Sequence, residues 1–174
     1  MELLVAGADV EPALLAEVST LGHPPRVIAV FRRREVRGSA GIALALWHVS
    51  DPGNVGALIR SAEAFGAAVM LSEGCADPFG PKALRAGMGS TFRVPLPEFE
   101  LRDAVALVAD GGEPLGGLDR YSTILLGSER EGLPQDVLDR CAGRMTIPVR
   151  GVESLNVAMA GTIALYERTR QSGV

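Results

Sequence analysis

The chain has 174 residues, of which 47% are hydrophobic and 22% are charged, and its formal net charge is −4. A chain of this length and hydrophobicity can bury one substantial core, which excludes a disordered or fibrous protein and favours a compact α/β domain. The negative net charge excludes a global positive field that would attract nucleic acid, so any RNA contact must be local.

The sequence contains neither a membrane-spanning segment nor a metal-binding pattern. Its longest apolar stretches, such as Ile42–Trp47, are too short to cross a bilayer, and no cationic region precedes an apolar core at the N-terminus. Cys75 and Cys141 lack metal-ligand spacing and do not make a disulfide framework. We therefore predict a cytoplasmic protein with no membrane partner, no metal and two reduced cysteines.

The first forty residues predict one helix and one strand. Glu11–Ser19 has helical apolar spacing, and the prolines at 24 and 25 break the chain before the β-like run Val27–Phe31. An arginine cluster surrounds the end of this run, and it either neutralises RNA phosphates or forms a solvated loop. Charge alone leaves both readings open for its members, Arg26, Arg32, Arg33, Arg34 and Arg37.

From Gly41 onward the chain alternates between apolar runs of strand length and segments with helical spacing. This alternation predicts a parallel sheet with helices on both faces. The expected strands are Ile42–Val49, Ala67–Leu71, Phe92–Val94, Thr123–Gly127 and Met145–Pro148, with a further one near Pro114-Leu115. The expected helices are Asn54–Phe65, Pro81–Met88, Glu100–Ala109, Pro134–Cys141 and Leu155–Arg170.

Three segments of this α/β region combine a buried strand, a glycine- or proline-marked loop and the start of a helix. They carry the patterns Asn54-x-Gly56-x-x-x-Arg60, Gly127-Ser128-Glu129 and Ser154-Leu155-Asn156. In α/β proteins, ligands bind at the loops that follow the carboxyl ends of the strands. The three loops therefore predict a single site.

Taken together and in this order, the three patterns resemble the signature motifs of the SpoU/TrmH-type RNA ribose 2′-O-methyltransferases, members of the trefoil-knotted (SPOUT) superfamily. The resemblance covers roughly Glu11–Gln171. It implies a homodimer that uses S-adenosylmethionine to methylate a ribose in tRNA or rRNA. It also implies a C-terminal trefoil knot, in which about Leu126–Ala160 threads through a preceding loop.

The resemblance further implies two regions along the chain. Residues 41–174 are expected to form the methyltransferase domain. Many members of the family carry an N-terminal RNA-binding domain, and residues 1–40 look like the remnant of such a domain plus a linker. Whether the natural protein starts upstream of Met1, and how it selects RNA, stay open. The same reading makes Arg32, Arg33 and Arg34 the expected RNA contacts.

Arg60 is the residue whose interpretation changes most with the resemblance. The helical pattern alone predicts that Arg60 is a surface arginine on an amphipathic helix. The family resemblance implies that Arg60 is the catalytic group. The six residues from Asn54 to Arg60 correspond to about 600° of helix rotation, so the two side chains do not share a helix face. Since a guanidinium is too basic to be an ordinary proton acceptor, we expect Arg60 to bind a phosphate beside the target ribose and stabilise the developing alkoxide. The phosphate is then the expected proton sink, and deprotonation by Arg60 itself stays open.

The other expected catalytic residues are Asn54, Glu129, Ser154 and Asn156. Glu129 could hold Arg60 or an amide by a charge-assisted hydrogen bond, or it could cap a helix. Ser154 and Asn156 precede the last helix, so we expect one of them to be its N-cap and the other to face the site.

The apolar, carbonyl-rich loops after the later strands suit an adenine held by backbone hydrogen bonds between aliphatic side chains. The resemblance identifies the ligand as S-adenosylmethionine. The expected cofactor-binding residues are Leu126, Gly127, Ile147, Pro148, Leu155 and Asn156.

Two other functions remain to be weighed. A non-catalytic RNA-binding or assembly module could keep the methyltransferase fold, although the presence of all five polar motif residues favours an enzyme. A Rossmann-like nucleotide-binding enzyme is disfavoured, because the chain lacks the GxGxxG and P-loop patterns. His23 and His48 show no triad or metal-ligand spacing, and Lys82 and Arg85 are either phosphate contacts or solvated side chains.

Overall fold

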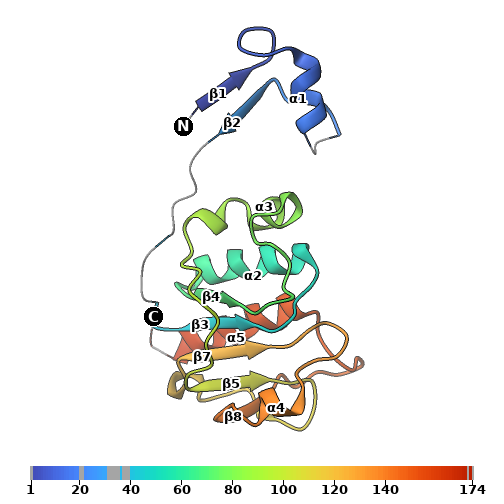
Figure 1. The fold of residues 1–174 in the computed structure, drawn as a ribbon. Helices are drawn as coiled ribbons and strands as arrows, with labels where there is room; N and C mark the ends of the chain where they lie inside the picture. The colour runs from blue at the N-terminus through green and yellow to red at the C-terminus, as the bar shows by residue number, and fades with distance from the viewer. Residues whose placement is uncertain (1, 20–21, 31–35, 37–39, 172, 174) are drawn as a thin grey trace. The chain divides into compact units, whose positions relative to one another are not determined.

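The computed structural model describes residues 2–19, 22–30, 36, 40–171 and 173 (Figure 1). The chain divides into two compact units, residues 1–34 and 35–174. Arg32, Arg33 and Arg34 lie outside the described residues, so their expected RNA contact stays a prediction.

The N-terminal unit is a two-stranded antiparallel sheet with one helix. Strand β1 (Glu2–Val5) pairs with β2 (Val27–Val30), and helix α1 (Pro12–Val18) connects them. A proline opens α1, where the missing N–H costs no helical hydrogen bond. The predicted helix and the strand up to Val30 are confirmed, whereas β1 was not predicted.

The C-terminal unit contains a six-stranded sheet in the order β4-β3-β7-β5-β8-β6, with every neighbouring pair parallel. The parallel sheet predicted from the alternation is therefore confirmed. Its strands are β3 (Ala43–Leu46), β4 (Ala68–Leu71), β5 (Ala104–Leu107), β6 (Glu113–Pro114), β7 (Thr123–Leu126) and β8 (Gly143–Thr146).

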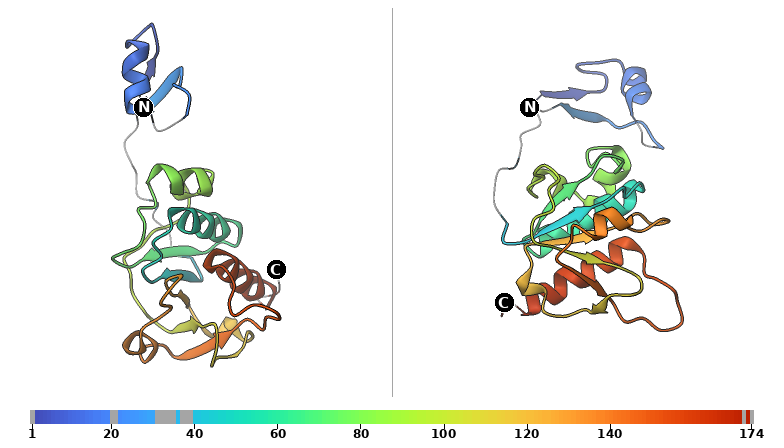
Figure 2. Two further views of the ribbon diagram at one scale, coloured as in Figure 1. Left: turned by 90° about the vertical axis from the view of Figure 1, so that its right-hand side faces the viewer. Right: turned by 60° about the horizontal axis from the view of Figure 1, so that its bottom comes forward.

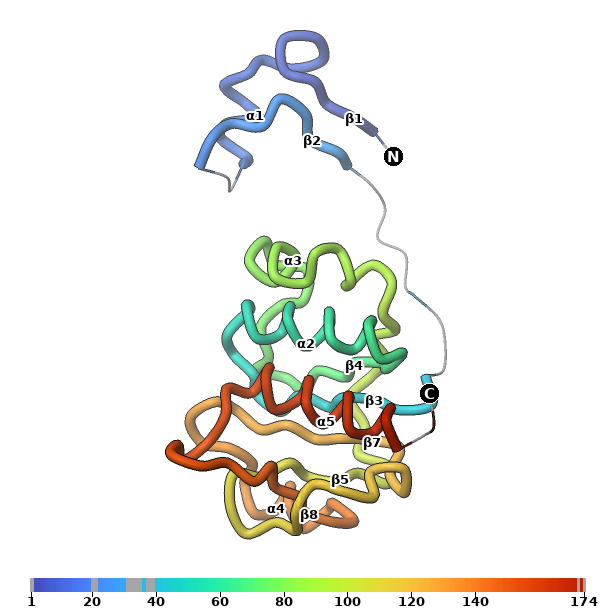
Figure 3. Tube along the Cα trace, turned by 180° about the vertical axis from the view of Figure 1, so that it is seen from behind, coloured from blue at the N-terminus to red at the C-terminus, as the bar shows by residue number. Residues whose placement is uncertain are grey.

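Helices cover both faces of this sheet, as predicted. Leu44 of β3 and Ile124 of β7 point to the face covered by α2 (Pro52–Ala64) and α5 (Val157–Gln171), whereas Ala45 and Leu125 share the second cluster with Val137. Val137 belongs to the short helix α4 (Gln135–Leu138). Figure 3 shows α2 and α5 side by side, and Figure 2 shows α4 on the other side of the sheet.

Helix α3 (Pro81–Gly87) packs closely on α2. A Cβ atom added at Gly56 would lie 2.8 Å from the Cβ of Ala86 and closer still to the carbonyl oxygen of Ala83. The two helix backbones can approach this closely only because residue 56 has no side chain.

Two predicted elements are wrong. Glu100–Ala109 is not a helix, because Ala104–Leu107 forms β5 between β7 and β8. A short apolar run buried on both faces has no alternation, so its sequence pattern resembles that of a buried helix. Phe92–Val94 is not a strand; Ser90–Phe92 forms the 3-10 helix η1, and the amide of Val94 bonds to the carbonyl of Ser90.

The expected strand Ile42–Val49 is shortened to β3, because the chain turns at His48, whose φ is +52°. The remaining short elements are η2 (Leu118–Arg120) and the two-residue β6, near the expected Pro114-Leu115 strand. After β8 the chain returns across the sheet, and α5 packs against α2 and β7. The trefoil knot stays a prediction.

Because all six strands are parallel, their carboxyl ends meet at one edge of the sheet. The loops after β3, β5, β7 and β8 therefore lie together there, and they carry the motif residues. In the described part of the chain, no helix is both long and apolar enough to span a bilayer.

Candidate functional site

A cavity of about 540 Å³ opens at the carboxyl edge of the sheet, within the size range of small-molecule sites. It lies between the loops that follow β5, β7 and β8 and the start of α5. Its lining residues are Leu107–Ala109, Leu126–Leu133, Ile147, Val149 and Glu153–Val157, with Ala160.

Most of the predicted cofactor residues line this cavity. Leu126, Gly127, Ile147, Leu155 and Asn156 belong to its wall, whereas Pro148 does not. Pro148 stands between two lining residues, Ile147 and Val149, and its role in cofactor binding stays a prediction.

One wall of the cavity, formed by Leu107, Val108 and Ala109 at the end of β5, was not predicted from the sequence. These residues were assigned to a helix, which hid the fact that they follow a central strand. The available signal was the apolar run Ala104–Leu107 followed by the turn residues Asp110-Gly111-Gly112.

The loop after β7 is built on glycine. The backbone of Ser128 pairs with that of Gly132 through two hydrogen bonds of 3.1 and 3.2 Å, and Gly132 has φ +66°. A Cβ at Gly127 would lie 2.6 Å from the carbonyl oxygen of Gly132. The loop can therefore fold back over the end of β7, where it forms part of the cavity wall, only with glycine at 127.

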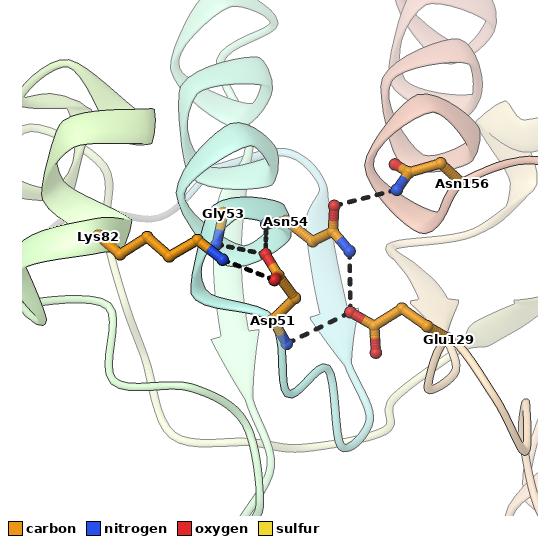
Figure 4. Close-up of polar contacts among 6 residues, drawn as sticks. All are labelled: Asp51, Gly53, Asn54, Lys82, Glu129 and Asn156. Atoms are coloured by element: carbon orange, nitrogen blue, oxygen red, sulfur yellow. Dashed lines mark hydrogen bonds and ion pairs between the residues drawn. The ribbon is translucent and has the colours of Figure 1, made fainter.

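Three polar motif residues meet beside the cavity (Figure 4). The Asn54 side-chain amide donates to Glu129 Oε1 at 2.9 Å, and its carbonyl oxygen accepts from Asn156 Nδ2 at 3.1 Å. The backbone N–H of Asp51 also donates to Glu129 Oε1, at 3.4 Å. Glu129 therefore accepts from the Asn54 side-chain amide and from the backbone N–H of Asp51 at the start of α2, and it makes no hydrogen bond or ion pair with Arg60 within the described chain.

The N-terminus of α2 is fixed by its own cap. The Asp51 carboxylate accepts from the backbone N–H groups of Gly53 and Asn54 at 2.6 and 3.0 Å, and Lys82 of α3 donates to it at 2.8 Å (Figure 4). Hydrogen bonds from the Lys82 ammonium and then from the backbone N–H of Asn54 lower the pKa of the Asp51 carboxyl. The cap thus stays ionised at neutral pH and holds Asn54 in place. Lys82, expected to be either a phosphate contact or a solvated side chain, forms an ion pair with Asp51 and stays largely exposed.

Asn156 is the N-cap of α5, because its Oδ1 accepts from the backbone N–H groups of Ala158 and Met159 at 2.9 and 3.3 Å. Its amide nitrogen is then free to reach Asn54. Ser154 is exposed and lines the cavity. Of the two candidate caps, Asn156 is therefore the cap and Ser154 faces the cavity.

Arg60 stands apart from this cluster. It is exposed on α2, does not line the cavity, and makes no hydrogen bond or ion pair with any described residue. Within one chain the structure brings Asn54, Glu129 and Asn156 together and leaves Arg60 outside.

Neither cysteine joins the site. Burial raises the pKa of both the Cys75 and the Cys141 thiol, so both remain protonated at neutral pH. Among residues 2–19, 22–30, 36, 40–171 and 173, no three His, Cys, Asp or Glu side chains cluster in a way that could hold a metal ion.

Comparison with known proteins gives a family match that covers most of the chain. Residues 41–166 match the SpoU rRNA Methylase family. A 23S rRNA (uridine(2479)-2′-O)-methyltransferase of Streptomyces viridochromogenes is 34% identical over 92% of the chain. A 23S rRNA (guanosine(2553)-2′-O)-methyltransferase of Bacillus subtilis is 33% identical over 82% of it. The chain spans 66% and 64% of the lengths of these two relatives.

A solved structure has the same fold. The AdoMet-bound rRNA methyltransferase from Sinorhizobium meliloti has a TM-score of 0.78 and 29% identity, and the match covers 91% of this chain and 69% of that one. The parallel sheet flanked by helices is therefore an architecture that this protein shares with methyltransferases of known structure.

Proposed function

Because the chain belongs to the SpoU rRNA Methylase family, we propose that it transfers a methyl group from S-adenosylmethionine to the 2′-hydroxyl of a ribose in tRNA or rRNA. The observation that carries the proposal is the position of the Asn54–Glu129–Asn156 cluster at the edge of the 540 Å³ cavity. The 2′-O-methyltransferase names of two relatives support the same reaction.

The residues of the cavity fit the proposed cofactor. Leu107, Leu126 and Ile147 supply aliphatic walls for an adenine ring, and the neighbouring loops supply backbone groups for its polar edge. The close approach at Gly127 leaves the cavity wall without a side chain at that point. When bound, S-adenosylmethionine supplies an electrophilic methyl group, and no metal ion is required.

The chain's own residues would orient the substrate and stabilise charge. Arg60 binds a backbone phosphate beside the target ribose and stabilises the negative charge that develops on the 2′-oxygen. That oxygen gains the methyl group and loses its proton, for which the phosphate is the acceptor. Asn54, held in one orientation by Glu129 and Asn156, fixes the start of the helix that carries Arg60.

Two features support a homodimer: Arg60 lies outside the cavity of its own chain, and α5 carries an exposed apolar stripe. On α5, three large apolar side chains one turn apart are exposed, namely Met159 (62%), Ile163 (38%) and Tyr166 (57%). Residues at this spacing form one stripe along a helix. A second copy of the chain would cover the stripe through its own α5 and bring Arg60 to the site of its partner. Sedimentation of Ile163→Glu should show a monomer where the unchanged protein sediments as a dimer.

Three further parts of the proposal rest on family membership. The segment from β7 to α5 forms the trefoil knot, residues 1–40 form an RNA-binding region with its linker, and the protein is cytoplasmic. The arginines at 32, 33 and 34 then contact RNA phosphates ahead of the methyltransferase domain. Their joint replacement by alanine should weaken RNA binding and flatten its salt dependence.

The deciding experiment combines the full chain, S-adenosylmethionine with a labelled methyl group, and unmodified in vitro transcripts of tRNA and rRNA. Transfer of label to ribose, recognised by resistance of the neighbouring bond to alkaline cleavage, would support the proposal. Calorimetry should show about one cofactor per chain, with no effect of a chelator. RNA binding without transfer would favour the non-catalytic module, and absence of cofactor binding would overturn the methyltransferase function.

A further inference from the structure

The loop after β3 holds an exposed histidine in a left-handed backbone conformation. His48 has φ +52°, and only two other described residues besides glycine, Met88 and Asp103, have positive φ. Histidine is tolerated in this region better than most residues, but glycine adopts it without steric cost. A side chain at this position therefore costs conformational energy that glycine would not.

The His48 ring is fixed by its neighbours. It stacks on Trp47 with ring centroids 4.8 Å apart and planes within 7°. A Cβ built at Gly74 would lie 3.3–3.4 Å from three atoms at the base of the ring, so Gly74 lies close against the ring. The backbone N–H of His48 donates to Ser72 Oγ at 3.0 Å. These contacts hold the ring in place, and Trp47 covers one of its faces.

The same loop is tied to the cavity on both sides of His48. Before it, the Trp47 N–H donates to the Leu126 carbonyl at 2.8 Å, at the start of the cavity wall. After it, the Asp51 N–H reaches Glu129, and the Val49 side chain between them is fully buried. His48 thus belongs to a loop that borders the site, although its own contacts outside that loop are with Ser72 and Gly74 after β4 and it does not line the cavity itself.

We propose that the edge of the His48 ring donates a hydrogen bond to a phosphate of the RNA strand that enters the site. The ring nitrogens make no hydrogen bond with any described residue, so this donor capacity is unused within the chain. Because Trp47 already stacks on the ring, the proposed contact is an edge hydrogen bond to the RNA backbone and not base stacking. A residue held in a costly conformation in a loop that borders a site is commonly kept for function. This inference rests on the proposed function and adds a substrate contact to it.

Two substitutions separate the contact from the conformation. His48→Gly removes the ring and relieves the backbone, so thermal stability should be kept or rise. His48→Asn tolerates the left-handed conformation and keeps an N–H donor. Binding is measured by filter retention of unmodified 23S rRNA and bulk tRNA transcripts. His48→Gly should weaken binding about five-fold, the effect of one lost hydrogen bond, and His48→Asn should recover most of it.

S-adenosylmethionine affinity is the internal control, because His48 does not line the cavity. Equal RNA affinity of His48→Gly and the unchanged protein would overturn the inference while leaving the methyltransferase proposal intact. A loss of cofactor affinity parallel to the loss of RNA affinity would also overturn it, since His48 would then only support the loop. If the unchanged protein neither binds nor methylates RNA, the proposed function fails and this contact fails with it.

Discussion

Replacement of Arg60 by alanine tests whether catalysis can be lost without loss of folding or cofactor binding. Arg60 is exposed and has no partner among the described residues, so its removal should change the free energy of unfolding by less than about 0.5 kcal/mol. For a chain of this size that corresponds to a change of about 2 °C or less in Tm. Since Arg60 does not line the cavity, S-adenosylmethionine affinity should stay within about two-fold.

Methyl transfer should respond very differently. Loss of one group that stabilises a developing oxyanion costs about 10²- to 10³-fold in rate, or about 3–4 kcal/mol in the transition state. Arg60→Lys should recover little of this, because an ammonium cannot reproduce the planar, two-pronged donor of a guanidinium.

The assay is single-turnover methyl transfer to the responsive transcript, with thermal unfolding and cofactor calorimetry on the same preparations. Arg140→Ala is the matched control, because Arg140 is exposed just after α4, on the opposite face of the sheet from α2. Near-normal transfer by Arg60→Ala would refute the catalytic role. A comparable loss in Arg140→Ala would mean that general surface charge, and not Arg60, carries the effect.

Three further changes have defined outcomes. Gly56→Ala forces a side chain into the backbone of α3, and thermal unfolding should show a loss of about 2 kcal/mol, as for other overpacked sites. Gly127→Ala pushes the loop at Gly132 away from β7, so calorimetry should show weaker cofactor binding while unchanged affinity would contradict the role of this close approach. Hydrogen bonding to Arg93, and then to Ser90, lowers the pKa of Glu63 from 4.5 to about 2. The stabilisation from the ionised Glu63 carboxylate is therefore complete above about pH 4.5 and is lost as the pH falls towards 2. In Glu63→Gln the free energy of unfolding should depend less on pH in this interval. An unchanged pH dependence would contradict the interaction.

The sequence predicted those parts of the fold whose pattern is local. The strands at β3, β4, β7 and β8 and the helices α2 and α5 each carry a pattern of spacing, proline or glycine that their own residues determine. The run Ala104–Leu107 does not, because its pairing with β7 and β8 decides its structure. With β5 misassigned, one wall of the cavity could not be predicted.

In the site, too, local patterns were predicted and long-range contacts were not. The motif residues were predicted, but the choice between Arg60 and an amide as the partner of Glu129 was not, because the bonded residues are 75 positions apart in the chain. The link between Asn54 and Asn156 spans 102 positions. Contacts of this range depend on the order of strands in the sheet, which the alternation of elements leaves undetermined.

The Asn54 side-chain amide bonds to both Glu129 and Asn156, and this has a thermodynamic consequence. A single carboxylate, that of Glu129, both borders the cavity and holds the start of α2, and the same amide reaches the start of α5. A cofactor that favours one arrangement of the loop after β7 therefore also favours one arrangement of both helix termini. Linkage is reciprocal, so RNA that prefers this arrangement must tighten S-adenosylmethionine binding by the same factor by which the cofactor tightens RNA binding.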